Sequence, residues 1–491
     1  MRTRPFQGFL IPLLLAAAAA SFTSGCATNP VTGTPDLVFM SEAKEIQLGN
    51  SYDGKVRSQY GIYADPALQA YVQEIGRKLA AQSHRPNLEY HFTVLDSDQV
   101  NAFALPGGHI YITRGILAYL DSEAELAAVL GHEIGHVTAR HGVRQHAAAT
   151  TTGVIGAVLG AATGIQATQD LFSVFGNAML SGYGRDHELE SDRLGAEYLA
   201  RAGYDPQAMI RVVGVLKNQE EFEKKRAEAE KRAPQIYHGV FATHPSADQR
   251  LQEVVGEADK FKTLSAPRVE REAYLKHLDK LAYGDSAGGG VRRGSRFYHR
   301  DMDFTLRFPD GWILDNQARV LYGVSPDKLA VLRVEAEDLA KDLPAEEFLK
   351  TRLKGTALEQ AGPVPGLAGP SHTGVVKVGA AFGKRPMRVA VVDHRDKRFL
   401  FQGAARDATA FAAHDPLFLQ TIGSLRLLTG KEKRLAEGWR VHVVRARPGD
   451  SFASLAKTSP LAEHAELTLR LINGKFPDGE PRAGEPIKII E

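Results

Sequence analysis

Residues 129–141 read VLGHEIGHVTARH and carry two histidines and a glutamate at helical spacing. His132 and His136 are four residues apart, so on a helix they project from one face about one turn apart and can reach a single ion. Glu133 points to the neighbouring edge of the same cavity. This is the HExxH pattern, in which two imidazoles hold Zn²⁺ and the carboxylate takes a proton from water that the metal activates.

The residues before the motif predict the helix that it requires. Ser122–Leu130 (SEAELAAVL) places apolar residues at helical spacing, and Glu125 follows Ser122 by three positions, as in a capping box. The alternative reading is a core helix whose two histidines are satisfied and bind no metal. A third ligand distinguishes the two readings.

Candidates for that third ligand lie in the stretch 185–195, RDHELESDRLG. Two histidines leave zinc short of ligands, because a catalytic site has three protein ligands and a water. Glu188 and Asp192 are four residues apart on a predicted helix, so one can bind the metal while the other orients a ligand from behind. Glu190 is the alternative third ligand, but at two residues from Glu188 it should face another side of the helix.

Four motifs occur in an order that is similar to a known family. They are HEIGHVTARH, ELESD, the upstream stretch NAFALPGGHIYI at 101–112 and the downstream THP at 243–245. Together they closely resemble the gluzincin metallopeptidase family of HtpX, BepA and the CaaX prenyl proteases, over residues 41–255. The resemblance implies a mainly α-helical (α+β) zincin-type domain that holds one Zn²⁺ per chain.

The resemblance also implies roles for individual residues. Five belong to the metal site: the zinc ligands His132, His136 and Glu188, the general base Glu133, and Asp192 behind the ligands. Ser191 stands where the family usually has alanine, which exchanges one small residue for another.

Substrate contacts are implied by the first and the last of the four motifs. Asn101, Ala102 and Phe103 lie on the family's edge strand, which would pair with substrate backbone by strand addition. For Asn101 the alternative is an ordinary turn residue. His244 resembles the family's late histidine near the metal, where it would stabilise the oxyanion or occupy the open metal position. A solvated loop histidine is the alternative.

The N-terminus predicts export. Residues 1–25 have the form of a signal peptide, with a basic start and an apolar run that is too short for a membrane span. Cys26 is the only cysteine, and TSGC resembles a bacterial lipobox with Thr23 where an aliphatic residue is usual. We expect a periplasmic protein anchored to the outer membrane by a lipid on Cys26, with residues 26–40 as a linker. Ordinary cleavage near an idle cysteine is the alternative.

Residues 147–169 are uncharged and rich in Ala, Gly and Thr, as in a membrane span. They lie between His136 and Glu188, so a single crossing would put the ligands of one metal on opposite sides of a bilayer. We therefore expect a small-residue helix pair over the cleft or a segment that touches a membrane surface.

A chain of 491 residues is too long for one core and predicts about three domains. The metallopeptidase domain spans 41–284, and the Gly-rich stretch 285–296 predicts a flexible linker. Residues 297–428 mix strand-like runs with two helical patterns and predict a small α+β sandwich without a ligand constellation.

Residues 438–491 resemble a LysM module of βααβ order, with a Pro-Gly-Asp turn and Asn473-Gly474 in sequence. The resemblance implies binding to peptidoglycan. The stretch SPLAEHAEL lengthens the usual spacing between the helices, so docking to protein is the alternative.

Taken together, the sequence predicts a zinc-dependent endopeptidase of the bacterial cell envelope that acts in protein quality control on unfolded or misassembled envelope proteins. The alternative is a lipid-anchored chaperone or peptidoglycan-binding scaffold with a gated or inactive metal site, and a peptidoglycan hydrolase is a third possibility. With 60 Lys and Arg against 58 Asp and Glu, nothing favours nucleic acid. No 34-residue repeat is visible, which separates this chain from the BepA type.

Overall fold

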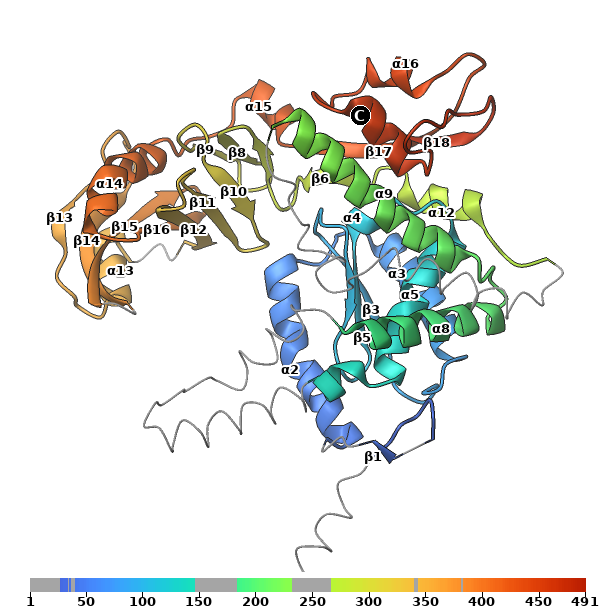
Figure 1. Ribbon diagram of the computed structural model, residues 1–491. Coiled ribbons are helices and arrows are strands. Elements are labelled where there is room, and N and C mark those ends of the chain that lie inside the picture. Colours follow the sequence, from blue (N-terminus) through green and yellow to red (C-terminus); the bar gives the residue numbers. More distant parts are fainter. Residues whose placement is uncertain are drawn as a thin grey trace, which may run out of the picture.

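The computed structural model describes residues 27–33, 35–36, 40–145, 183–231, 266–339, 343–380 and 383–491. The described part comprises an N-terminal domain that carries the HExxH motif, a sheet domain and a C-terminal module (Figure 1). Three predicted features lie outside the described residues: the signal peptide with Cys26, the segment 147–169, and His244.

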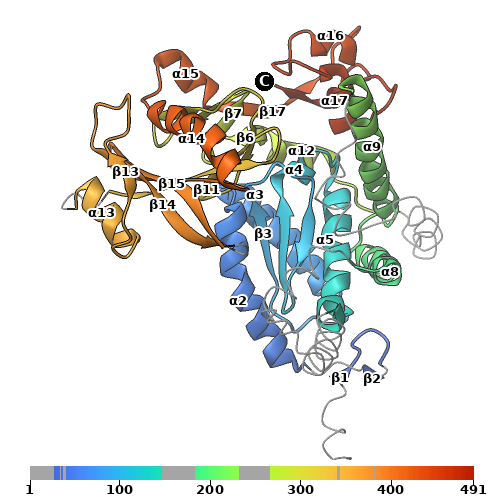
Figure 2. The same cartoon turned by 60° about the vertical axis from the view of Figure 1, so that its left-hand side comes forward.

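The N-terminal domain packs helices around a three-stranded sheet of order β3-β5-β4. Strand β5 is parallel to β3 and antiparallel to β4, and a turn at Gly107 and Gly108 joins β4 to β5. Both glycines have positive φ, which suits residues without a side chain. In Figure 2 the sheet lies between α2 and α5. The elements are α2 (Glu42–Tyr60), α3 (Pro66–Ala80), β3 (His91–Leu95), β4 (Ala102–Ala104), β5 (His109–Thr113), α4 (Arg114–Leu117), α5 (Glu123–Thr138), α8 (Arg185–Arg201), α9 (Ala208–Ala229) and α12 (Arg271–Leu278). Two short strands, β1 (Ala27–Thr28) and β2 (Pro35–Asp36), precede them.

Helix α3 covers the β3 edge of this sheet. It begins after Asp65, whose carboxylate accepts a hydrogen bond from the Leu68 N–H, and Pro66 occupies its first turn. The Gln69 side chain then donates to the Val94 carbonyl at 2.8 Å and accepts from the Val94 N–H at 2.9 Å. These bonds satisfy backbone groups of β3, so β4 is the edge strand that α3 leaves uncovered.

The sheet domain is a seven-stranded antiparallel sheet of order β10-β11-β12-β16-β15-β14-β13. Its two helices lie on opposite faces, because Val389 and Val391 of β15 pack with α13 whereas Ala390 and Val392 pack with α14. This arrangement agrees with the predicted mixture of strands and two helices. The elements are β10 (Ile313–Asn316), β11 (Val320–Val324), β12 (Ala330–Asp338), α13 (Ala345–Arg352), β13 (Glu359–Gly362), β14 (Ser371–Ala380), β15 (Gly383–His394), β16 (Lys397–Ala405) and α14 (Ala408–Gly423).

The stretch 285–296 is folded, and the prediction of a flexible linker there is wrong. Gly290 and Gly294 have positive φ and form turns between strands, so these glycines shape a fold and are not a spacer. Arg292 fixes the stretch by donating to Asp285 and, at 3.0 Å, to Asp98 of the N-terminal domain. The strands here are β6 (Ala282–Ser286), β7 (Val291–Arg293), β8 (Arg296–His299) and β9 (Phe304–Arg307).

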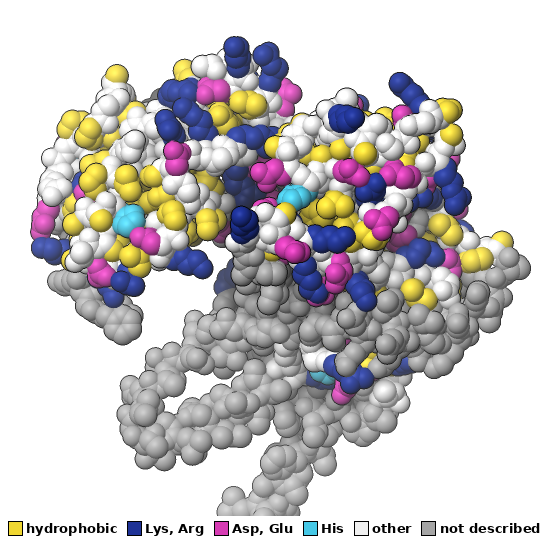
Figure 3. Space-filling model, turned by 45° about the horizontal axis from the view of Figure 1, so that its top comes forward, with side chains coloured by type: hydrophobic (Ala, Val, Ile, Leu, Met, Phe, Trp, Pro, Cys, Tyr) yellow, Lys and Arg dark blue, Asp and Glu magenta, His cyan; other side chains and the backbone are white. Residues whose placement is uncertain are grey.

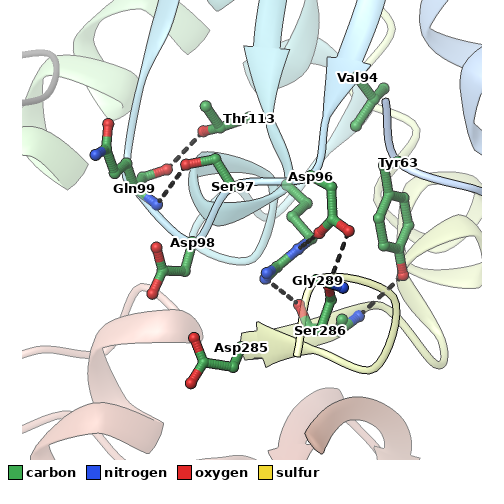
Figure 4. A network of polar contacts seen from close by, with 12 residues as sticks. Tyr63, Val94, Asp96, Ser97, Asp98, Gln99, Thr113, Asp285, Ser286 and Gly289 are labelled. Atoms are coloured by element: carbon green, nitrogen blue, oxygen red, sulfur yellow. Dashed lines mark hydrogen bonds and ion pairs between the residues drawn. The ribbon is translucent and has the colours of Figure 1, made fainter. Parts of the chain in front are cut away.

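A network of polar contacts joins β6 to the N-terminal domain (Figure 4). Asp96 accepts from the Arg114 Nε at 2.6 Å and from the Ser286 Oγ at 2.8 Å. The Ser286 Oγ in turn accepts from the Gly289 N–H at 3.0 Å. Arg114 also donates to the Ala282 carbonyl at 3.1 Å. We call this set of contacts the junction network.

The C-terminal module has the predicted βααβ order and is docked on the N-terminal domain. Strand β17 pairs with both β18 and β6, which ties the module into the junction. Lys488 of β18 is fully buried, and its Nζ donates to the carbonyls of Ala118 at 3.0 Å and Leu120 at 2.7 Å. The same Nζ lies 3.0 Å from a carboxylate oxygen of Asp121. The elements are α15 (Gly430–Leu435), β17 (Gly438–Arg445), α16 (Phe452–Ala456), α17 (Ala465–Ile472) and β18 (Pro486–Ile490).

The surface mixes charges of both signs. In Figure 3, basic, acidic and hydrophobic side chains alternate over the face that presents the sheet domain and the C-terminal module. Ion pairs between such side chains include Arg426–Glu432 and Arg300–Glu437. Among the helices that the structure describes, none combines the length and the apolar character that crossing a bilayer requires.

Candidate metal centre

Helix α5 carries the HExxH motif and is buried along its whole length. The Ser122 hydroxyl caps it by accepting from the Glu125 N–H at 3.3 Å. The Glu125 carboxylate accepts from the N–H of Asp121 at 2.7 Å, one residue earlier than a capping box would place it. His132 and Glu133 are 6 % and 2 % exposed, so this capped helix holds both inside the protein.

Helix α8 lies very close to α5 because small residues face each other across the contact. A Cβ atom at Gly135 would come within 3.0 Å of the Ser191 backbone, and one at Gly195 within 3.1 Å of the backbone nitrogen of His132. A larger residue at either position would push the helices apart. The close approach brings Glu188 and Asp192 of α8 to the histidines of α5.

Three groups that can each donate an electron pair to a metal ion converge where these helices meet. The Nε2 atoms of His132 and His136 are 3.0 Å apart. The Glu188 carboxylate places one oxygen 3.5 Å from the His132 Nε2 and the other 3.5 Å from the His136 Nε2. All three residues are buried, and their ligand atoms lie within 4.8 Å of one another.

The spacing of the three donors fits a tetrahedral ion. Zinc binds imidazole nitrogen and carboxylate oxygen at about 2.0–2.2 Å, so two ligands of a tetrahedral site should lie about 3.3 Å apart. Separations of 3.0 and 3.5 Å fall on either side of that value. Two imidazoles and one carboxylate also leave a fourth position for water or substrate, as catalytic sites do.

Asp192 orients the first histidine. Its carboxylate lies 2.8 Å from the His132 Nδ1 and is 1 % exposed. A carboxylate there accepts the Nδ1 proton, which leaves the Nε2 lone pair directed at the point where the three donors converge. The structure therefore places the Asp192 carboxylate beside the Nδ1 atom of His132.

A second histidine orients His136. The His136 Nδ1 lies 2.8 Å from the His141 Nδ1, and the His141 Nε2 lies 3.0 Å from a Glu190 oxygen. If the Nε2 of His136 binds a metal, its Nδ1 carries the proton and donates to His141, whose Nε2–H then donates to Glu190. Burial lowers the pKa of His141 to about 4, which keeps that ring neutral. Glu190 thus faces His141, away from the ligand position.

Tyr183 covers one face of the His136 imidazole. Its ring stacks on His136 with centroids 4.0 Å apart and planes 20° apart. Burial and the nearby charges of Glu133 and Glu188 raise the pKa of Tyr183, so its phenol stays protonated. Sequence reasoning missed both Tyr183 and His141; the only signal for either was an aromatic or imidazole ring within five residues of a predicted ligand.

The predicted substrate residues lie on β4 and just before it. The Asn101 backbone N–H donates to Thr113 Oγ1 at 3.1 Å. The buried side-chain oxygen of Asn101 has no hydrogen-bond partner among the described residues. Ala102 is buried against α5, and the Phe103 ring stacks on Tyr111 with centroids 5.0 Å apart. The structure thus places this strand beside α5, the helix that carries His132 and His136.

A second group of possible ligands differs in exposure. Glu230, Glu463 and His464 bring ligand atoms within 4.8 Å of one another where α9 meets the C-terminal module. Both carboxylates are exposed, and groups of this kind are common without an ion. Burial and oriented histidines separate the site on α5 and α8 from this surface group.

Comparisons with known proteins agree with this geometry. The family model "Peptidase family M48" matches residues 66–258, which include α5 and α8. The chain is 29 % identical over 276 residues to the Beta-barrel assembly-enhancing protease of Escherichia coli strain K12, and 32 % identical over 263 residues to that of Yersinia pestis. It is 33 % identical over 156 residues to the Mitochondrial metalloendopeptidase OMA1 of Arabidopsis thaliana.

These matches cover parts of each protein. The alignments include 53 % and 50 % of this chain for the two bacterial relatives and 32 % for the plant relative. The chain spans 54 % and 50 % of the bacterial relatives' own length and 31 % of the plant relative's. The similarity therefore applies to the domain that holds the site.

Proposed function

We propose that this chain is a zinc-dependent endopeptidase with one metal site, since residues 66–258 match the model of peptidase family M48. In the proposal His132, His136 and Glu188 are the zinc ligands and Glu133 is the general base. The observation that carries it is the convergence of three buried donor groups at separations of 3.0 and 3.5 Å.

The residues around the site support hydrolysis of an amide. When bound, zinc supplies a Lewis acid that polarises a carbonyl and lowers the pKa of water to about 7. Glu133 takes the proton of the attacking water and returns it to the leaving amine. Asp192 and His141 hold the imidazoles of His132 and His136 in the orientation that coordination needs.

Strand β4 supports an extended polypeptide as substrate. It is the edge strand of its sheet, and Ala102 lies on it beside the metal-binding helix. A substrate that pairs with β4 is recognised through its main chain and can carry many different side chains. We further propose that Asn101, Ala102 and Phe103 bind substrate and that His244 stabilises the oxyanion.

The cellular role is proposed from the relatives and the N-terminal sequence. Two relatives are named for enhancing β-barrel assembly, and residues 1–25 have the form of a signal peptide. We propose an exported, periplasmic lipoprotein, anchored to the outer membrane through Cys26, that degrades unfolded or misassembled envelope proteins. For the LysM-like module we propose peptidoglycan binding through the surface that docking leaves free.

The experiment that tests the activity is cleavage of casein by the purified protein, with bound zinc measured in the same samples. The wild type should cut casein and hold one zinc, and Glu133→Gln should hold zinc without cutting. If both hold zinc and neither cuts, the proposed peptidase activity is wrong, and the scaffold or chaperone reading replaces it. Loss of zinc from Glu133→Gln would instead mean that this residue helps to hold the metal.

A further inference from the structure

A small apolar cavity lies directly beside the proposed general base. Its volume is about 30 Å³, and residues of α4, β4, α5 and α9 line it. Glu133 and His132 form one wall, and Ala102 of the edge strand forms another. The remaining lining residues are aliphatic: Ile116, Ala128, Val129, Met209, Val212, Val213 and Leu216.

The position of this cavity relates it to a bound substrate. A strand added to β4 runs along Ala102, and its side chains alternate between the two faces of the sheet. The side chains that point to the α5 face enter the region of Glu133 and His132. The side chain of the substrate residue next to the scissile bond therefore points toward this cavity.

We propose that this cavity is the specificity pocket for a substrate residue next to the scissile bond, and that it selects a small aliphatic side chain. The inference rests on the proposed peptidase function, and it adds a substrate class that the backbone pairing of β4 does not define.

Size and polarity together decide the selection. A volume of about 30 Å³ holds about two water-sized groups, which suits the side chain of alanine or valine. Leucine or phenylalanine would need α9 to move. A charged side chain would lose its hydration without a partner among the aliphatic walls, which disfavours Asp, Glu, Lys and Arg.

Helix α9 sets the depth of the pocket. Val213 and Leu216 are buried there, at 0 % and 4 % exposure, and both are far enough from the metal ligands in sequence to be changed independently. Shortening either side chain should deepen the pocket without removing a ligand. Discrimination by one methylene in a hydrophobic pocket is typically about 10- to 200-fold.

The test compares cleavage sites in a peptide library cut by the full-length protein. The wild type should favour Ala and Val at one position beside the cut. Leu216→Ala, and the milder Val213→Ala, should raise the rate ratio of Leu to Ala at that position by about tenfold or more. The matched controls Leu68→Ala and Val72→Ala remove the same atoms from buried sites on α3, outside the pocket, and should keep the wild-type preference.

Each outcome bears on a distinct claim. If all variants cut with the wild-type preference, the cavity is only a packing void and the inference is overturned while the peptidase function stands. If the controls shift the preference as much as the α9 variants, loosening of the core is the cause and the inference is again overturned. Absence of any cleavage by zinc-loaded wild type overturns the proposed function and this inference with it.

Discussion

Two polar clusters of this protein use carboxylates in opposite ways. At the metal centre, His132, His136 and Glu188 direct their acceptor atoms at one point, 3.0 to 3.5 Å from each other. In the junction network the one carboxylate meets hydrogen-bond donors instead: Asp96 accepts from Arg114 at 2.6 Å and from Ser286 at 2.8 Å. The first cluster gathers acceptors, and the second pairs acceptors with donors.

This difference separates a binding site from a structural contact. Converging lone pairs repel one another unless a cation lies between them, so such an arrangement is suited to a ligand. Paired donors and acceptors are already satisfied and need nothing further. Removing a residue should therefore change metal content at the first cluster and only stability at the second.

The largest effect is expected for Glu188→Ala at the metal centre. With two imidazoles left, zinc affinity should fall, and casein cleavage should drop by about a thousandfold or more because Lewis acid chemistry supplies several kcal/mol. Zinc content and cleavage rate are measured on the same preparation. Full zinc occupancy in this variant would remove Glu188 from the ligand set.

Asp192→Ala should have the next largest effect. Loss of the carboxylate 2.8 Å from His132 leaves the imidazole free to rotate, which typically lowers metal affinity by about 10- to 100-fold. Competition with a zinc chelator of known affinity gives the value. Asp192→Asn, which keeps the shape and a hydrogen-bonding oxygen, serves as the conservative control and should lose less.

Asp96→Ala in the junction network should reduce stability and leave zinc affinity unchanged. It leaves the buried Arg114 without its carboxylate, at a cost of about 2 kcal/mol in the free energy of unfolding. Urea unfolding measures that change, and zinc titration of the folded variant provides the comparison. Weaker zinc binding by folded Asp96→Ala would show that the two clusters are coupled.

Strand β8 ends on a buried histidine, His299, to which no carboxylate of the described residues is hydrogen-bonded. Burial lowers the pKa of His299 to about 4, while the unfolded chain titrates near 6.5. Between these values the unfolded state binds more protons, so stability is full above about pH 6.5 and falls as pH drops toward 4. From pH 7 to pH 5 the loss should be about 1–2 kcal/mol. Unfolding curves at both pH values give the free energy of unfolding for the wild type and for His299→Gln. The wild type should lose more of this free energy between pH 7 and pH 5 than His299→Gln does, and equal losses would contradict the prediction.

The smallest effect is expected at the exposed group of Glu230, Glu463 and His464. His464→Ala should leave zinc at one per chain, because exposed carboxylates keep their hydration and gain little from an ion. Elemental analysis after dialysis measures the ratio. If the wild type held two zinc ions per chain and this variant held one, exposure would be a poor guide to metal binding in this protein.

The parts that sequence predicted well are those that depend on helical period. The spacing of His132 and His136, and of Glu188 and Asp192, places each pair on one helix face, and the structure brings the two pairs together. The start of α3 at Pro66 likewise follows from local chemistry. Such features need only the residues within one or two turns.

The contacts that the sequence did not predict form where the helical repeat of the chain is interrupted. Arg140 ends α5 with φ of 56°, a left-handed conformation that turns the backbone so that His141 comes back to His136. On a continuing helix, a residue five positions on would face elsewhere, so no periodic pattern reveals this contact. The stretch 285–296 was misjudged for a related reason: its glycines form turns, and the partner of Arg292 at Asp98 is distant in sequence.

The buried amine of Lys488 has a consequence for the order in which the protein is made. It binds the carbonyls of Ala118 and Leu120, immediately ahead of the cap of α5, yet the two partners are separated by about 370 residues of chain. A ribosome completes the HExxH motif long before it reaches this lysine, and a translocated chain emerges in the same order. The motif helix therefore receives this support only after residue 488 has been synthesised.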